Sequence, residues 1–229
     1  MNCCNQCQGI EDLFNQKVAE DDLRDYHKNG PPKQTRLLLD TLRAAGIEGL
    51  TLAPATPALA GAEVELVPMM AREFRLKRAI DALRGSFDYI LIDCPPSLGL
   101  LTVNALTAAD EVIVPVQCEY LALEGLSQLT ATLELVRRNL NSRLRLRGLL
   151  LTMFDGRTNL SQQVADEVRS HFANTFKTVI PRSVRLSEAP SHGLPIARYD
   201  PSSRASKAYD ELAEELIAGS RAGVLGVGG

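Results

Sequence analysis

From about residue 50 onward, short apolar runs alternate with segments in which apolar residues recur every three or four positions. The apolar runs, each of which predicts a buried strand, are 50–54, 87–93, 111–116, 144–153 and 178–180. The amphipathic segments, each of which predicts a helix, fall within 74–83, 98–108, 126–140, 160–172 and 205–216. Near-continuous apolar strands separated by helices are typical of a parallel sheet that is covered on both faces. The sequence therefore predicts a doubly wound, mostly parallel α/β fold.

Composition excludes several classes of protein. The chain has 229 residues, of which 45% are hydrophobic, and a formal net charge of −3 from 25 basic and 28 acidic residues. This balance argues against global disorder and against a polycationic nucleic-acid coat protein, although a local basic face stays possible. The best apolar run, 99–116, contains Asn104, Asp110 and Glu111, and the N-terminus lacks the basic start and apolar core of a secretory signal. We therefore expect a cytoplasmic protein.

The cysteines do not suggest a disulfide framework. Their number is five, which is odd, and Cys3, Cys4 and Cys7 crowd the N-terminus while Cys94 and Cys118 lie in apolar runs. The Cys4-x-x-Cys7 spacing is compatible with a metal or redox site, but no second Cys/His pair follows at zinc-finger distance. A frayed terminus is the alternative interpretation, and we favour it.

The segment Ile90-Leu-Ile-Asp93-Cys-Pro-Pro-Ser97 is the strongest candidate for chemistry. Its apolar residues predict a central strand that ends in an acid, and the two prolines force a turn there. In open α/β sheets, ligands bind beyond the carboxyl ends of the strands, where an Asp can support Mg²⁺ beside a nucleotide. The pattern has low specificity, and an Asp that merely caps a helix would look the same.

Three long segments together resemble one known family. They are ILIDCPPSLGLLTVNALTAADEVIVPVQCEYLALEGLSQL, LLLTMFDGRTNLSQQVADEV and VIPRSVRLSEAPSHGLPIARYDPSSRASKAYDELAEEL, and LAGAEVELV (59–67) adds a weaker match. They resemble the ParA/Soj family of chromosome- and plasmid-partitioning proteins, which are deviant-Walker P-loop ATPases related to MinD. The resemblance runs from about residue 50 to residue 216.

The resemblance implies a P-loop NTPase-like fold, ATP and Mg²⁺ as cofactors, and nonspecific binding to double-stranded DNA of the nucleoid. It also implies a ParB-type centromere-binding partner and an ATP-dependent homodimer. On this basis we expect a divergent segment at 1–36, an incomplete AAA-type nucleotide-binding domain at 37–218 and a flexible tail at 219–229. The last predicted helix is acidic rather than basic, so MinD-like membrane attachment is not expected.

Matching positions carry the family's nucleotide-site roles. Asp93 matches the Walker B acid that supports the Mg²⁺ coordination sphere, and Ser97 matches the switch region that senses the γ-phosphate. Met153 and Pro181 fall where family members sandwich the adenine ring, with Asp155 near the same pocket. A core methionine and a strand-ending proline are the alternative interpretations for Met153 and Pro181.

Arg157 and Arg185 match the arginines through which Soj-like proteins contact DNA. Guanidinium groups on loops suit phosphate binding if they are not paired with acids nearby in the sequence, which is what we expect here. Further positive charge comes from Arg182, Arg198, Arg204 and Lys207. The arginine-rich run 137–147 is better explained as a solvated helix end and strand decoration.

The sequence departs from the family in one respect. Family members open with a Lys-Gly-Gly-Val-Gly-Lys-Thr-Thr phosphate loop, whereas this sequence contains no Gly-Lys dipeptide. The nearest imitation, Gly30-Pro-Pro-Lys33-Gln-Thr35, cannot aim backbone N–H groups at a phosphate because proline has none. With the Walker A and switch I motifs absent, no catalytic residue is predicted and ATP binding is not expected.

Three hypotheses follow from this departure. The chain is a partition ATPase whose N-terminus was lost, a ParA-like module that binds DNA or partners without hydrolysing ATP, or a nonfunctional remnant. The family's missing first strand belongs at the centre of the sheet, beside the strand that carries Asp93. Its absence leaves strand edges uncovered, so marginal stability or aggregation is expected.

Overall fold

The computed structural model describes residues 38, 41–57, 59–95, 97–119 and 122–225. The expected segment 1–36, including Cys3, Cys4 and Cys7, lies outside the described residues. The described residues divide into two compact units. Unit 1 comprises those up to Asp110 and those of 131–144, and unit 2 comprises 111–130 and those from Arg145 onward.

The elements of unit 1 are β1 (Arg43–Ala44), β2 (Thr51–Leu52), α4 (Leu59–Leu66), η1 (Arg72–Phe74), α5 (Arg75–Asp81) and α6 (Leu100–Ala108). Those of unit 2 are β3 (Glu111–Gln117), β4 (Arg145–Phe154), α8 (Asn159–His171), β5 (Thr175–Pro181), α9 (Val184–Glu188), η2 (Ala189–His192), α10 (Ile196–Tyr199) and α11 (Arg204–Leu225). Helix α7 (Ala122–Asn139) begins in unit 2 and ends in unit 1.

Unit 2 is built on a three-stranded sheet in the order β3-β4-β5, and both strand pairs are parallel. Val114 lies opposite Leu149 in the first pair, and Leu151 lies opposite Val179 in the second. At Gly148, β4 passes so close to the carbonyl of Asn174 and the ring of Phe176 that an added Cβ would overlap both. The parallel α/β fold predicted from the apolar runs is confirmed.

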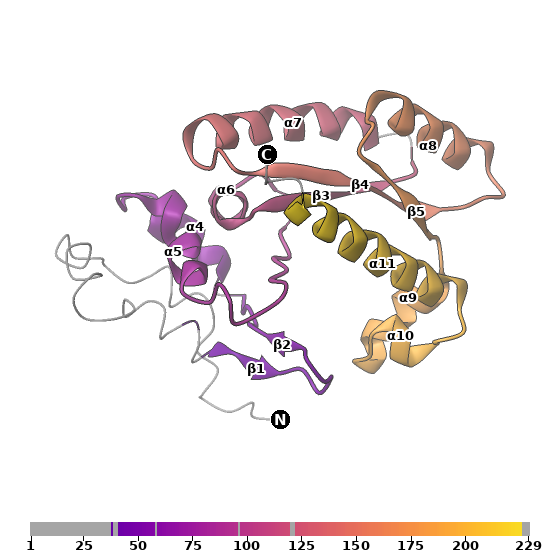
Figure 1. Cartoon of the computed structure of the whole chain (residues 1–229), viewed down its shortest axis with the longest axis horizontal. Coiled ribbons are helices and arrows are strands. Elements are labelled where there is room, and N and C mark those ends of the chain that lie inside the picture. The colour runs from indigo at the N-terminus through magenta and orange to yellow at the C-terminus, as the bar shows by residue number, and fades with distance from the viewer. Residues whose placement is uncertain (1–37, 39–40, 58, 96, 120–121, 226–229) are drawn as a thin grey trace. The chain divides into compact units, whose positions relative to one another are not determined.

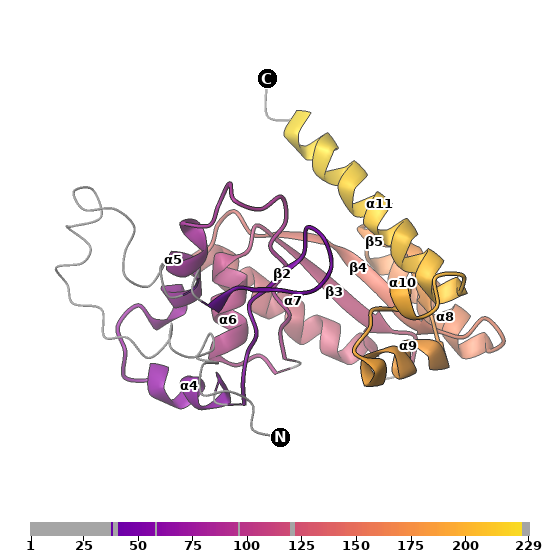
Figure 2. The ribbon, with the colours of Figure 1, turned by 90° about the horizontal axis from the view of Figure 1, so that it is seen from below.

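Helices cover both faces of this sheet (Figures 1 and 2). Because side chains alternate along a strand, Leu149 and Leu151 of β4 pack with α7 and α8, whereas Leu150 between them packs with α11. The first layer is completed by Val114, Val116, Cys118, Leu126, Val164, Ala165 and Val168. The second contains Phe176, Ile180, Ala208 and Leu212. The sequence of β4 is apolar on both sides because both of its faces are buried.

An acid on α11 also contacts the backbone of β5. The backbone N–H groups of Lys177 and Thr178 donate to the Glu215 carboxylate at 2.9 Å and 3.1 Å. Partial burial of this carboxylate opposes its ionisation, but the hydrogen bonds outweigh that effect and lower the pKa of Glu215. Helix α11 therefore binds β5 through polar contacts as well as through its apolar face.

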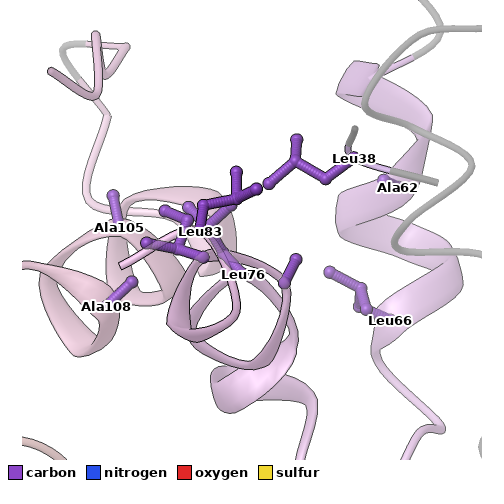
Figure 3. Packing of buried hydrophobic residues seen from close by; sticks show 9 residues of the cluster. Leu38, Ala62, Leu66, Leu76, Leu83, Ala105 and Ala108 are labelled. Carbon is purple, nitrogen blue, oxygen red and sulfur yellow. The ribbon is translucent and has the colours of Figure 1, made fainter. Parts of the chain in front are cut away.

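The core of unit 1 is a separate apolar cluster, shown in Figure 3. It brings together Leu38, Ala62, Leu66, Leu76, Ala79, Ile80, Leu83, Ala105 and Ala108. Asn104, which is fully buried, joins α6 to its neighbours: its Oδ1 accepts the Leu76 N–H at 3.2 Å, and its Nδ2 donates to the Arg72 and Leu100 carbonyls. These bonds satisfy an N–H of the first turn of α5, which has no partner inside its own helix.

The strand expected at 87–93 is not formed, so this prediction was wrong. Within the described residues of this segment, one isolated bridge joins Phe87 to Arg84, and Tyr89, Ile90 and Leu91 are exposed. Hydrophobicity predicts burial, but a strand also needs a neighbouring strand to pair its backbone groups. The described residues supply none for this run. The strand expected at 50–54 is likewise reduced to Thr51–Leu52, paired with β1.

The tail differs from the expectation as well. Helix α11 continues through Gly219 to Leu225, whereas a flexible tail was expected from Gly219. Alanine and leucine between the glycines favour the helix, and no proline interrupts it. Residues 226–229 lie outside the described residues.

Candidate functional site

The carboxyl ends of β3, β4 and β5 lie at the same edge of the unit 2 sheet because the three strands are parallel. Glu119 follows β3, Asp155 follows β4 and Arg182 follows β5. The Arg182 Nη2 atom lies 2.5 Å from Glu119 Oε1, and the Arg182 N–H donates to the Phe154 carbonyl at 2.9 Å. Charged side chains thus converge on the edge at which open α/β sheets bind ligands.

Asp155 and Arg157 form a two-bond ion pair in the turn after β4. The Arg157 Nε and Nη2 atoms donate to the two carboxylate oxygens at 2.9 Å and 2.7 Å, and the Arg157 N–H donates to Oδ1 at 3.1 Å. These side-chain and backbone bonds hold the pKa of Asp155 well below its usual range, with the nearby Arg182 adding to the effect. Asp155 therefore stays ionised, and 88% of the Arg157 side chain remains exposed to solvent.

Met153 and Pro181 lie on neighbouring strands at this edge. Pro181 is the register partner of Phe154, the residue after Met153. Met153 is 37% exposed and has a positive φ of 55°, which is unusual for a residue with a side chain. The alternative of a buried core methionine does not fit this exposure. Strained backbone conformations cluster at functional sites, so Met153 supports placing the site here.

Arg185 lies on α9, which follows β5. Its Nη1 atom donates to Glu188 Oε2 at 3.0 Å, and its Nε atom lies 3.5 Å from Asp200 Oδ2. The guanidinium carbon lies 6.0 Å from the centre of the Tyr199 ring, and the Tyr199 hydroxyl donates to Glu188. Fifty-seven per cent of the Arg185 side chain is exposed.

The expectation that Arg157 and Arg185 are unpaired with nearby acids was wrong. Both arginines contact carboxylates a few residues away, because a tight turn folds Asp155 back onto Arg157 and one helical turn aligns Arg185 with Glu188. The structure brings the two arginines to the same edge as Met153 and Pro181. Sequence reasoning missed the role of Glu119, which lies far from Arg182 along the chain.

Asp93 and Ser97 belong to unit 1, and their surroundings differ from those expected. Asp93 is exposed in a segment without regular structure, so it does not end a central strand. Ser97 is also exposed, and its carbonyl accepts the Thr102 hydroxyl at 2.6 Å, next to the start of α6. The Asp93 side chain is therefore not held in place by a strand.

Unit 1 also contains a hollow of about 240 Å³, lined mainly by charged side chains: Lys77, Asp81, Arg84, Ala108, Ala109, Asp110, Asn141 and Arg143. Arg84 lies 2.9 Å from Asp81 and 3.0 Å from Asp110, which raises the pKa of its guanidinium. Its charge is thus balanced by two acids of unit 1, and we assign no ligand to this hollow.

The described residues show neither a metal site nor a membrane-spanning helix. They contain no group of three or more His, Cys, Asp and Glu side chains that could hold a metal ion. None of their helices combines the length and apolar character needed to cross a membrane.

Comparison with known proteins places the chain among close relatives. A family model described as an AAA domain matches residues 32–146. The sporulation initiation inhibitor protein Soj of Bacillus subtilis is 59% identical over 182 residues, which cover 79% of this chain and 72% of Soj. The chromosome partitioning protein ParA of Caulobacter vibrioides is 50% identical over 187 residues, which cover 80% of this chain and 70% of ParA.

Solved structures agree with the fold. Cobyrinic acid a,c-diamide synthase from Mycobacterium smegmatis, with bound ADP and magnesium, matches with a TM-score of 0.71 and 33% identity over 96% of this chain and 75% of that one. The cell division ATPase MinD of Pyrococcus furiosus matches with a TM-score of 0.67 and 19% identity over 93% of this chain and 77% of that one. At that identity, the likeness to MinD shows the fold alone.

Proposed function

Since the chain belongs to the ParA/Soj family of partitioning ATPases, we propose that it is a partition protein that binds duplex DNA without sequence preference. The contact residues in this proposal are Arg157 and Arg185. The observation that carries it is that the side chains of Arg157 and Arg185 are 88% and 57% exposed and follow neighbouring parallel strands of one sheet.

The chemistry of these groups suits phosphate. A guanidinium group donates through a planar fork that matches phosphate oxygens, and Arg182 adds a third arginine at the same edge. The formal net charge of the chain is −3, so attraction to DNA has to arise from this local patch. A protein that contacts a few DNA phosphates and no base edges binds duplex DNA with a dissociation constant of about 10⁻⁴–10⁻⁶ M at physiological salt.

The residues of this chain suit the adenine end of a nucleotide but not its phosphate end. Met153 and Pro181, on adjacent strand ends, could hold an adenine ring, as the family resemblance implies. The phosphate and Mg²⁺ side does not fit, because Asp93 is not delivered by a strand and the sequence lacks a Gly-Lys phosphate loop. Mg²⁺ relies on substrate phosphates for many of its ligands, so Asp93 alone cannot hold Mg-ATP. We therefore propose that this chain binds DNA without help from ATP.

We propose a protein partner for this chain from its family membership alone. Relatives carry the names chromosome partitioning protein and partitioning ATPase. A partition protein works with a centromere-binding partner of the ParB type, and the family's dimer depends on ATP. We propose the same partner for this chain, at the nucleoid, and expect a single DNA-binding patch in each molecule when ATP does not hold two together.

Fluorescence anisotropy with a labelled duplex tests the DNA proposal. The unaltered chain should bind weakly, equally to unrelated sequences, and less tightly as salt rises because binding releases counterions from DNA. Replacing Arg157 and Arg185 together by alanine should abolish binding, whereas replacing Arg138, an exposed arginine of α7, should not. Full binding by the double variant would contradict the proposal.

Calorimetry tests the nucleotide proposal. Titrating Mg-ATP into the chain should give no binding tighter than about millimolar, because the cradle of backbone N–H groups and lysine is missing. Adding Mg-ATP to the anisotropy experiment should leave DNA affinity unchanged. Micromolar binding of Mg-ATP, or tighter DNA binding in its presence, would overturn this part.

A further inference from the structure

We infer that Asp155 is a built-in competitor of DNA: its carboxylate occupies the edge of Arg157 that a backbone phosphate would bind, and so limits DNA affinity. The inference rests on the proposed function, since it concerns the same arginine. It adds a residue that sets the strength of the contact.

The geometry of the pair makes the competition direct. Arg157 places Nε and Nη2, which lie on one edge of the guanidinium group, against the two oxygens of Asp155 at 2.9 Å and 2.7 Å. Phosphates are bound by arginine in the same two-bond arrangement. A phosphate therefore has to displace the carboxylate from this edge, or accept a less complete contact.

Asp155 is held in place more firmly than the arginine it binds. Its side chain is 19% exposed, against 88% for Arg157. Its Oδ1 atom also accepts the Arg157 N–H, and its own N–H donates to Ser161 Oγ at 3.4 Å. The carboxylate is thus fixed beside the turn, so its negative charge stays near any DNA that approaches Arg157.

Charge adds to the geometric effect. The ion pair has no net charge, so Arg157 attracts DNA less than an isolated arginine would. Arg185 has a similar arrangement, with Glu188 at 3.0 Å and Asp200 at 3.5 Å. Arg185 makes one hydrogen bond to Glu188 and a longer ion-pair contact with Asp200, and neither acid covers a whole edge of the guanidinium group, so we expect the larger effect at Asp155.

The test replaces Asp155 by asparagine, which keeps the Oδ1 acceptor for the backbone of the turn but removes the charge. The matched control is Asp166→Asn on α8, which also removes one negative charge; this acid is exposed and accepts a bond from Gln162 Nε2. Anisotropy with the same duplex is measured for the unaltered chain, D155N, D166N, R157A and the double variant D155N/R157A. Thermal melts of each variant check that the fold is kept.

D155N should bind DNA about three- to fivefold more tightly, which is the effect expected when an exposed ion pair no longer has to be broken. The slope of log affinity against log salt should steepen by up to about 0.9, because a guanidinium group without a neutralising acid now contacts a phosphate. D166N should change the affinity much less. In the R157A background, D155N should have no effect, since the residue over which they compete is gone.

The outcomes separate this inference from the proposed function. If R157A weakens binding but D155N binds no more tightly than D166N, the competitor role is wrong and the DNA site stands. An increase for D155N that persists in the R157A background would mean general repulsion, and would also overturn the inference. If the variant in which Arg157 and Arg185 are both replaced by alanine still binds DNA as the unaltered chain does, the proposed DNA site itself fails.

Discussion

Glu215 offers a sharp test of how unit 2 is held together. Its carboxylate on α11 accepts the N–H groups of Lys177 and Thr178 on β5, at 2.9 Å and 3.1 Å. Replacing Glu215 by alanine leaves these two backbone donors without that acceptor. The neighbouring Glu214, which is exposed, provides a matched control because Glu214→Ala makes the same change of helix propensity.

The size of the effect follows from the two bonds. A hydrogen bond to a charged group contributes about 1.5–3 kcal/mol when it is well buried. Glu215 is only partly buried, so water screens it, and we expect about 2 kcal/mol for both bonds together. In a protein of this size that corresponds to a fall in Tm of about 4–8 °C. Glu214→Ala should shift Tm by much less.

The pH dependence has a definite sign. The folded-state pKa of Glu215 is lowered, so its charge stabilises the fold above the unfolded pKa of about 4.3. That contribution is lost as pH falls below this value through the folded pKa. Chemical denaturation at neutral pH should therefore show a clear gap between the unaltered chain and E215Q, and the gap should narrow below about pH 4.

Two results would refute this reasoning. E215A that is no less stable than E214A would show that the strand donors find equal partners in water. A gap between the unaltered chain and E215Q that is as wide at about pH 3 as at pH 7 would show that the carboxylate charge is not what stabilises the contact.

Further predictions concern packing and exposure. Gly148→Ala should cost about 1–3 kcal/mol in chemical denaturation, because the new methyl group overlaps the backbone and ring described above. Gly125→Ala lies inside α7, and apart from the adjoining backbone of that helix no atom lies within 4 Å of the added carbon, so it should instead stabilise by about 0.5–1 kcal/mol. Asn104→Ala should cost about 1–3 kcal/mol because it leaves buried groups such as the Leu76 N–H unpaired, and equal stability would contradict the role of this side chain. Leu91→Lys, at a side chain that is 86% exposed, should change stability by less than about 0.5 kcal/mol while reducing light scattering on heating.

Sequence patterns predicted unit 2 well because each of its strands satisfies local and global requirements together. The apolar runs at 111–116 and 144–153 became β3 and β4, and the run at 178–180 became the end of β5. Strands β3 and β5 each pair with the central strand β4, and helices cover both faces of the sheet. Hydrophobic periodicity describes this situation correctly because burial and backbone pairing coincide.

The sequence predictions failed where burial and backbone pairing do not coincide. The run at 87–93 is as apolar as a central strand, yet Leu91 is 86% exposed, because pairing depends on a neighbour that the sequence of the run cannot reveal. The pairing of Arg157 with Asp155 was missed because it depends on the shape of a turn rather than on residue spacing. Met153 and Pro181 lie at neighbouring strand ends, and their part in binding adenine stays a prediction; the positive φ of Met153 carries no sequence signal.

The parallel arrangement of β3 and β4 has a consequence for synthesis on the ribosome. Glu111 and its register partner Arg145 are 34 positions apart, and a complete crossover helix has to emerge between them. At about 5–20 residues per second, β3 waits ~2–7 s before the first residue of its partner is made. During that time the apolar residues from Val112 to Val114 have no strand beside them in the finished register. Slow translation of this region would therefore lengthen the interval in which these apolar residues lack their partner strand, whereas faster translation of α7 would shorten it.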